Sequence, residues 1–231
     1  MNQQIDSHTQ HISRQFNIEL EEVKNRMLEM GGMVESQLRD ALESIIRLDT
    51  KLAEEVCRQD AIIDSLEIVI DEQCNRILAK RQPAASDLRL ILSIVKAIRD
   101  LERIGDEASK IAKMAVKLSS SENESPGSPY LLDIGERVVN MLHEALDAYA
   151  RGDAYIASAV LEEDDQVDAR YEEAIRDLVR TMTANPGNVS PALNSVWALR
   201  ALERIGDHAK NISEHVLYLV QGNDVRHGGR M

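Results

Sequence analysis

The chain has 231 residues, of which 43% are hydrophobic and 29% are charged, so a disordered or fibrous chain is excluded. Its formal charge of −13 excludes nucleic-acid binding through a basic surface. No apolar run reaches the roughly 18 residues of a membrane span, and residues 1–15 lack the apolar core of a signal peptide. Its two cysteines, Cys57 and Cys74, form no disulfide framework. We therefore expect a cytoplasmic protein that is not inserted in a membrane.

Two long helices are predicted at the start of the chain. After a polar lead-in, apolar residues at spacings of three and four indicate a helix that begins near Phe16. The pair Gly31-Gly32 interrupts this pattern, which predicts a kink or a close contact with another helix. Asp49 is suited to cap a second helix, and Pro83 ends it.

The same order then continues and repeats. A third helix is predicted over 86–118, and the Ser/Pro/Gly-rich segment 119–129 is a linker. Three more helices are predicted over about 131–150, 154–182 and 191–220. No segment shows the alternation of a β-strand.

An exact repeat supports a duplication. The hexapeptide Leu-Glu-Arg-Ile-Gly-Asp occupies residues 101–106 and returns at 202–207, a shift of 101 residues. We therefore predict an all-α protein of six helices, built as two pseudo-symmetric antiparallel three-helix bundles of the spectrin-like kind. The first repeat spans 16–118, the linker 119–129 and the second repeat 130–220.

Each copy places carboxylates where a helix of the core expects apolar residues. The glutamate of each hexapeptide continues a seam of apolar residues, and its aspartate lies four residues later on nearly the same face. The preceding helix of each repeat carries a pair of aspartates, also four residues apart. If these helices are neighbours, the pairs face each other and offer hard oxygen ligands for Mg²⁺, Mn²⁺, Ca²⁺ or iron. The candidate metal ligands are Glu102, Asp106, Glu203, Asp207, Asp60, Asp64, Asp164 and Asp168.

A simpler interpretation competes with metal binding. Arg99 and Arg200 each lie three residues before a hexapeptide glutamate and are placed to neutralise it. His208 and His215 are interpreted as surface residues rather than ligands. No nucleotide-binding or nucleophile motif is present, so no catalytic or cofactor-binding residues are assigned.

With these motifs assembled, the chain resembles the PhoU family of bacterial phosphate-signalling proteins over nearly its whole length. The resemblance depends on the two hexapeptides and on four other segments in the same order along the chain. These segments are Ala79–Pro83, Ser86–Arg89, Met30–Val34 and Asp224–His227.

The resemblance implies a homodimer that negatively regulates the phosphate-starvation (Pho) regulon and phosphate uptake. Such a protein is a non-catalytic adaptor between the ATP-binding subunit of a phosphate ABC transporter and a membrane sensor histidine kinase, with peripheral association at the membrane. It also implies metal binding on the acidic motifs, with magnesium, manganese, iron and zinc as candidate ions. Asn211 extends the second motif where the first repeat has Lys110, which predicts weaker metal binding at the first site.

Two other functions compete with the adaptor. A metal-dependent phosphohydrolase would use a pair of metal ions bridged by carboxylates, although no general base is assignable. A purely structural helical protein would use the acidic pairs only for salt bridges.

Overall fold

The computed structural model of the chain describes residues 2–81, 83–119 and 128–222. The predictions for most of the linker and for the carboxyl-terminal tail lie outside these residues. The elements, in chain order, are α1 (Asn2–Arg47), α2 (Thr50–Arg81), α3 (Ala85–Ser119), α4 (Ser128–Arg151), α5 (Ala154–Ala184), the 3₁₀ turn η1 (Pro186–Asn188) and α6 (Val189–Gln221).

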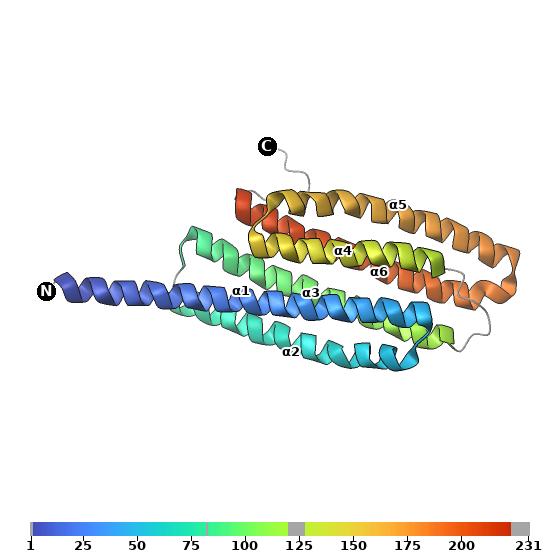
Figure 1. Cartoon of the computed structure of the whole chain (residues 1–231), viewed down its shortest axis with the longest axis horizontal. Helices are drawn as coiled ribbons and strands as arrows, with labels where there is room; N and C mark the ends of the chain where they lie inside the picture. Colours follow the sequence, from blue (N-terminus) through green and yellow to red (C-terminus); the bar gives the residue numbers. More distant parts are fainter. Residues whose placement is uncertain (1, 82, 120–127, 223–231) are drawn as a thin grey trace.

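The predicted all-α fold is confirmed. The described residues form six α-helices and contain no strand. The helices α1, α2 and α3 make one antiparallel bundle, and α4, α5 and α6 make a second one beside it (Figure 1). Long helices with short connections pack in this way because each buries one apolar stripe against two neighbours.

The turns between the first two helices of each bundle have the same construction. Asp49 Oδ1 accepts hydrogen bonds from the backbone N–H groups of Lys51 and Leu52, which confirms the predicted cap of α2. Asp153 caps α5 in the same manner. The residue before each cap has a left-handed backbone, with φ of 54° at Leu48 and 66° at Gly152.

The prediction for the start of the first helix is wrong. Helix α1 begins at Asn2 rather than near Phe16, and its amino-terminal part extends beyond the other helices (Figure 1). The sequence before Phe16 shows no apolar periodicity, so the pattern used for the prediction gives no signal there. Helix formation requires only backbone hydrogen bonds and acceptable propensity, and neither leaves a periodic signal.

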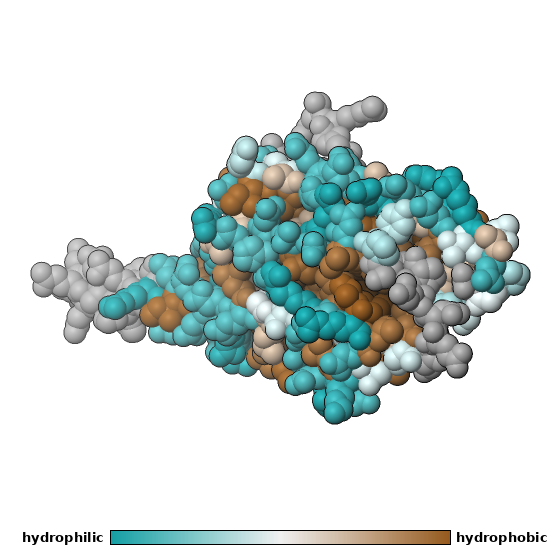
Figure 2. Space-filling model, turned by 45° about the vertical axis from the view of Figure 1, so that its right-hand side comes forward, coloured by the Kyte–Doolittle hydropathy of each residue, from teal (hydrophilic) through white to brown (hydrophobic). Residues whose placement is uncertain are grey.

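The two bundles pack through α3 against α6 and α1 against α4. Glycines allow the second pair to approach: a Cβ at Gly31 would lie 2.5 Å from Leu146 Cδ2, and one at Gly135 would lie 2.4 Å from Leu42 Cδ1. The expected close contact at Gly31 is therefore present, and α1 continues through it without a break. Figure 2 shows hydrophobic side chains gathered in a hollow of the surface; a groove between α1 and α4 has Leu42, Ile46, Leu132 and Val139 in its lining.

The two adjacent glycines of α1 provide a test of this contact. Alanine at either position should gain about 1 kcal/mol of helix propensity. A Cβ at Gly32 meets nothing within 4 Å, so Gly32→Ala should raise the free energy of unfolding. Gly31→Ala forces Leu146 to shift and should be about 1–3 kcal/mol less stable than Gly32→Ala. Urea denaturation of the two variants measures the difference, and equal gains would show that the contact is not tight.

Candidate functional site: two carboxylate clusters

The packing of α2 on α3, and of α5 on α6, brings together the acidic residues predicted from the sequence. In each group, neighbouring carboxylates contribute to a raised pKa at three members, which are Asp64, Glu67 and Glu102 in the first bundle and Asp164, Asp168 and Glu203 in the second. We call the group in the first bundle the first cluster; it comprises Asp60, Asp64, Glu67, Glu102 and Asp106. The second cluster, in the second bundle, comprises Asp164, Asp168, Glu203 and Asp207. Glu67 was not among the predicted ligands.

Each hexapeptide glycine lies against an aspartate of the neighbouring helix. A Cβ at Gly105 would lie 3.4 Å from Asp60 Oδ1, and one at Gly206 would lie 3.5 Å from Asp164 Oδ1. A side chain larger than hydrogen at either glycine would therefore reach the aspartate carboxylate. A Cβ at Gly105 would also lie 3.0 Å from Gln37 Oε1, so the first bundle has a steric reason for its glycine, whereas at Gly206 the contact would be an ordinary van der Waals one.

Burial and the neighbouring negative charges disfavour the charged form of several of these groups. Burial raises the pKa of Glu102, and the negative charges of Asp106 and Glu67 raise it further. The pKa of Glu203 is raised by burial and by Asp207, and the pKa of Asp64 by burial and Asp60. Both clusters therefore hold negative charge at an energetic cost that a bound cation would reduce.

The first cluster contains no ion-paired cation among the described residues, although the nearby charges of Arg99 and Arg103 partly oppose the rise in the pKa of Glu67. Gln37 Nε2 donates a hydrogen bond of 3.3 Å to Asp60 Oδ1, and Gln37 is itself fully buried. Across residues 2–81, 83–119 and 128–222, none of the five carboxylates forms an ion pair with a lysine, arginine or histidine. The predicted neutralisation of Glu102 by Arg99 is therefore not seen.

The second cluster contains two cationic side chains. Lys210 Nζ lies 2.6 Å from Asp164 Oδ2, and Arg200 forms an ion pair with Glu203 Oε1. The lysine lowers the pKa of Asp164, but burial outweighs it, so the pKa is raised overall. Asp164 is 1% exposed, and its Oδ1 and the Oε2 of Glu203 are buried without a partner among the described residues. The predicted neutralisation by Arg200 is thus present in this bundle only.

The donor set suits a hard cation, although the described side chains are not closed around one. Carboxylate oxygens are the ligands that Mg²⁺, Mn²⁺ and Ca²⁺ prefer. Among the described residues, no three His, Cys, Asp or Glu side chains are grouped closely enough to hold a metal ion. The orphaned oxygens of Asp164 and Glu203 nevertheless show that the second cluster has unused acceptor capacity.

The reason for expecting weaker binding in the first bundle is wrong. Asn211 donates its Nδ2 to Asp100, at 3.1 Å, and Lys110 binds Glu107, at 3.0 Å. Both side chains are thus engaged outside the clusters. The residues that distinguish the two clusters are instead Lys210 and Arg200, which form ion pairs with carboxylates of the second cluster, whereas Arg99 and Arg103 act on the first cluster without forming an ion pair with it in the described part of the chain.

A second polar site, which sequence reasoning missed, lies where α3 packs on α6. Asp100 Oδ1 lies 2.9 Å from His208 Nδ1, and Asp100 Oδ2 lies 3.0 Å from His215 Nε2. Burial alone would raise the pKa of Asp100, but the hydrogen bonds from His208, His215 and Asn211 outweigh it and lower the pKa. The interpretation of the histidines as surface residues is wrong, because His215 is buried and His208 is half-buried.

A sequence signal for this site did exist. His208, Asn211 and His215 are separated by three and four residues, so they form a polar stripe on one face of α6. Only the pairing of the two bundles shows that this face meets a carboxylate. Glu107 is likewise a polar residue whose partner lies in the other bundle: it is 3% exposed and forms an ion pair with Arg204 at 2.7 Å.

Comparisons with known proteins agree with this geometry. The PhoU domain family matches residues 27–115 and 131–216, one match in each bundle. A phosphate-specific transport system accessory protein PhoU homolog of Pseudomonas putida is 55% identical over 225 residues, covering 97% of this chain and 88% of the relative. The accessory protein PhoU of Escherichia coli K12 is 43% identical over 219 residues, covering 95% and 90%.

Solved structures give the same result. The crystal structure of PhoU from Pseudomonas aeruginosa superposes with a TM-score of 0.88 at 54% identity, covering 90% of this chain and 100% of that one. The phosphate transport system regulatory protein PhoU from Streptococcus pneumoniae gives a TM-score of 0.82 at 29% identity, covering 91% and 99%. The fold is that of a tandem three-helix protein with paired acidic clusters. The chain belongs to the PhoU family.

The raised pKa of Glu102 predicts a pH-dependent gain from its replacement. Between 4.5 and the folded pKa, the native state binds more protons than the unfolded state, so stability falls as pH rises through this window. Glu102→Gln removes that penalty. It should raise the free energy of unfolding by about 0.5–1 kcal/mol at neutral pH, allowing for solvent screening, and by nearly nothing below the ordinary pKa.

Denaturation in the presence of a chelator, at neutral and at acid pH, measures this effect. Glu162→Gln, which changes an exposed glutamate of α5 outside both clusters, is the matched control. A gain from Glu102→Gln that is the same at both pH values would contradict the electrostatic explanation.

Proposed function

We propose that the protein is a non-catalytic regulator of phosphate uptake and of the phosphate-starvation regulon. It acts as an adaptor between the ATP-binding subunit of a phosphate transporter and a sensor histidine kinase. The observation that carries the proposal is the match over 97% of the chain to an accessory protein of phosphate-specific transport. The name of the Streptococcus relative, which calls it a regulatory protein of that system, supports the regulatory part.

The surface of the protein is consistent with adaptor work. Long helices present extended faces, and no helix in the described ranges is long and apolar enough to cross a membrane. Contact with a membrane complex would then depend on its protein subunits. We expect the protein to work at the cytoplasmic side, as a dimer like that implied by the family resemblance.

A direct experiment tests the adaptor. The purified protein is immobilised, and binding of the transporter's ATP-binding subunit and of the kinase's cytoplasmic region is measured separately. Deletion of the gene should also raise expression of a phosphate-starvation reporter in phosphate-rich medium, and the intact gene should restore repression. Absence of binding to both proteins, together with unchanged repression after deletion, would remove the proposal.

Divalent cations are the ligands that we propose for the acidic clusters. The first cluster has five carboxylates without an ion-paired cation in the described part of the chain, whereas Lys210 and Arg200 already serve the second. A bound cation would relieve the repulsion that raises the pKa of Glu102 and Asp64. The ion would therefore stabilise the first cluster more than the second. Its role here is structural or regulatory, because no residue in either cluster is assigned as a general base.

Thermal denaturation with and without Mn²⁺ or Mg²⁺ tests this order. Asp64→Asn/Glu102→Gln should abolish most of the metal-dependent rise in melting temperature, and Asp168→Asn/Glu203→Gln should leave most of it. Elemental analysis of gently purified protein gives an independent readout. Equal loss in both double variants would contradict the assigned order, and metal-dependent hydrolysis of phosphate esters that Glu203→Ala abolishes would favour an enzyme.

A further inference from the structure

A groove between α2 and α3 differs from the rest of the surface in its charge. It has a volume of about 470 Å³ and is formed by the first turns of α2 and the last turns of α3. Its lining residues are Ala53, Glu54, Cys57, Arg58, Lys113, Val116 and Lys117.

The groove has an apolar floor flanked by cationic side chains from both helices. Ala53 is fully buried, and Val116 is a large apolar residue that remains 41% exposed. Arg58 projects from α2, while Lys113 and Lys117, four residues apart, lie on one face of α3. Glu54 is the single acidic residue in the lining. Cationic side chains thus flank apolar surface from both sides.

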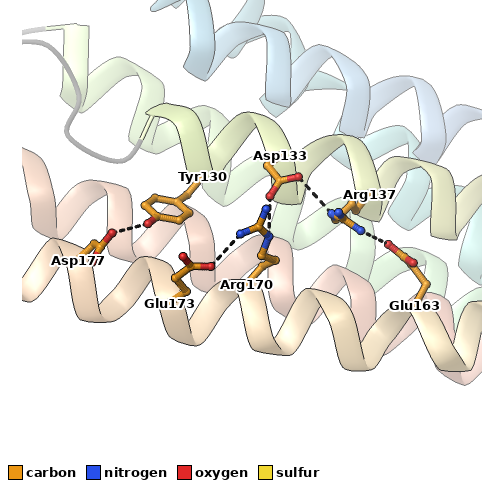
Figure 3. A network of polar contacts seen from close by, with 7 residues as sticks. All are labelled: Tyr130, Asp133, Arg137, Glu163, Arg170, Glu173 and Asp177. Carbon is orange, nitrogen blue, oxygen red and sulfur yellow. Dashed lines mark hydrogen bonds and ion pairs between the residues drawn. The ribbon is translucent and has the colours of Figure 1, made fainter.

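The three cations of the groove are not used by the fold. All three are exposed, and in the described parts of the chain none forms an ion pair. The second bundle differs, because every lysine and arginine within residues 128–222 is ion-paired. In Figure 3, for example, Asp133 is shared by Arg137 at 3.2 Å and Arg170 at 3.1 Å. Positive charge available to a partner therefore lies on the first bundle.

The chemistry of this groove selects its ligand class. A single exposed ion pair contributes at most about 1 kcal/mol, so one small anion would be held weakly here. A ligand with several carboxylates and an apolar side chain between them would contact both walls and the floor together. An amphipathic helix laid into a groove between two helices meets that requirement. On a protein of net charge −13, a local basic groove also directs where an acidic partner docks.

We propose that the α2–α3 groove is the docking site for an acidic amphipathic helix of a partner protein. The proposal rests on the adaptor function, and it names the part of the surface that one adaptor contact uses. Acidic side chains of the partner pair with Arg58, Lys113 and Lys117, and an apolar side chain covers Val116.

Charge reversal tests the groove against the rest of the surface. Arg58→Glu/Lys113→Glu/Lys117→Glu reverses the groove, and Arg26→Glu/Arg76→Glu/Lys80→Glu reverses three other cations that form no ion pair within the described segments. Because all six side chains are exposed, both variants should keep the helical circular dichroism of the wild type. Binding to the ATP-binding subunit and to the kinase's cytoplasmic region is measured for each. The groove variant should bind one of them about tenfold or more weakly, and the control should change it by less than about twofold.

Cys57 provides a readout inside the groove. It is half-buried there, whereas Cys74, the other of the two cysteines, is buried and has its pKa raised to about 12. Alkylation of the native protein should therefore report on Cys57. The partner that the groove variant loses should slow this alkylation in the wild type, and the other partner should not.

The outcomes separate this proposal from the adaptor function. If the wild type binds a partner and the groove variant binds it equally, with Cys57 unprotected, the groove is not the docking site and the adaptor stands. If the wild type binds neither partner, both proposals fail. If groove reversal abolishes binding to anionic phospholipid vesicles but leaves both proteins bound, the groove contacts a membrane and the docking proposal is wrong.

Discussion

The carboxylate of Asp100, half-buried where α3 meets α6, makes the interaction on which the arrangement of the two bundles depends. It faces His208 and His215 and accepts from Asn211, all from the other bundle. Removing a carboxylate from water costs several kcal/mol unless partners replace its hydration, and these three partners satisfy both oxygens. Sliding α6 along α3 would leave the carboxylate of Asp100 without its hydrogen-bond partners. The polar contacts therefore specify the register of a helix pair that apolar packing alone would hold less selectively.

The same helix pair supports the acidic clusters. Each cluster uses one face of α3 or α6 against the preceding helix, while the opposite face is fixed at the contact between the bundles. The two clusters share their carboxylates and their glycines but differ in compensation. Lys210 corresponds to Ser109 at the shift of 101 residues, so only the second bundle carries a lysine at this place. The two bundles thus have similar backbones, but their acidic clusters differ in how far ion pairs compensate the negative charge.

Much of this arrangement is predictable from the sequence, and the failures have a common cause. The cap at Asp49, the crowding at Gly31 and the facing acidic pairs follow from local chemistry and from the repeated hexapeptide. The misassignment of His208 and His215, and of the role of Asn211, arose because their partner is 108 to 115 residues away on another bundle. Periodicity identifies which face of a helix is polar, but it does not identify what that face meets. Nor does it show helix where no apolar face exists, as in the first turns of α1.

The residues that form the contact at Asp100 are not repeated in the two halves of the chain, so the two halves are not interchangeable. The residues that correspond to Asp100 and His208 at the shift of 101 are Ala201 and Glu107, so neither repeat contains both parts of this interaction. A first repeat paired with a copy of itself would place Asp100 opposite Glu107, and a second repeat paired with a copy of itself would place His208 opposite Ala201. The halves have therefore become complementary pieces. Expressed as two separate polypeptides, they should associate with each other in preference to themselves.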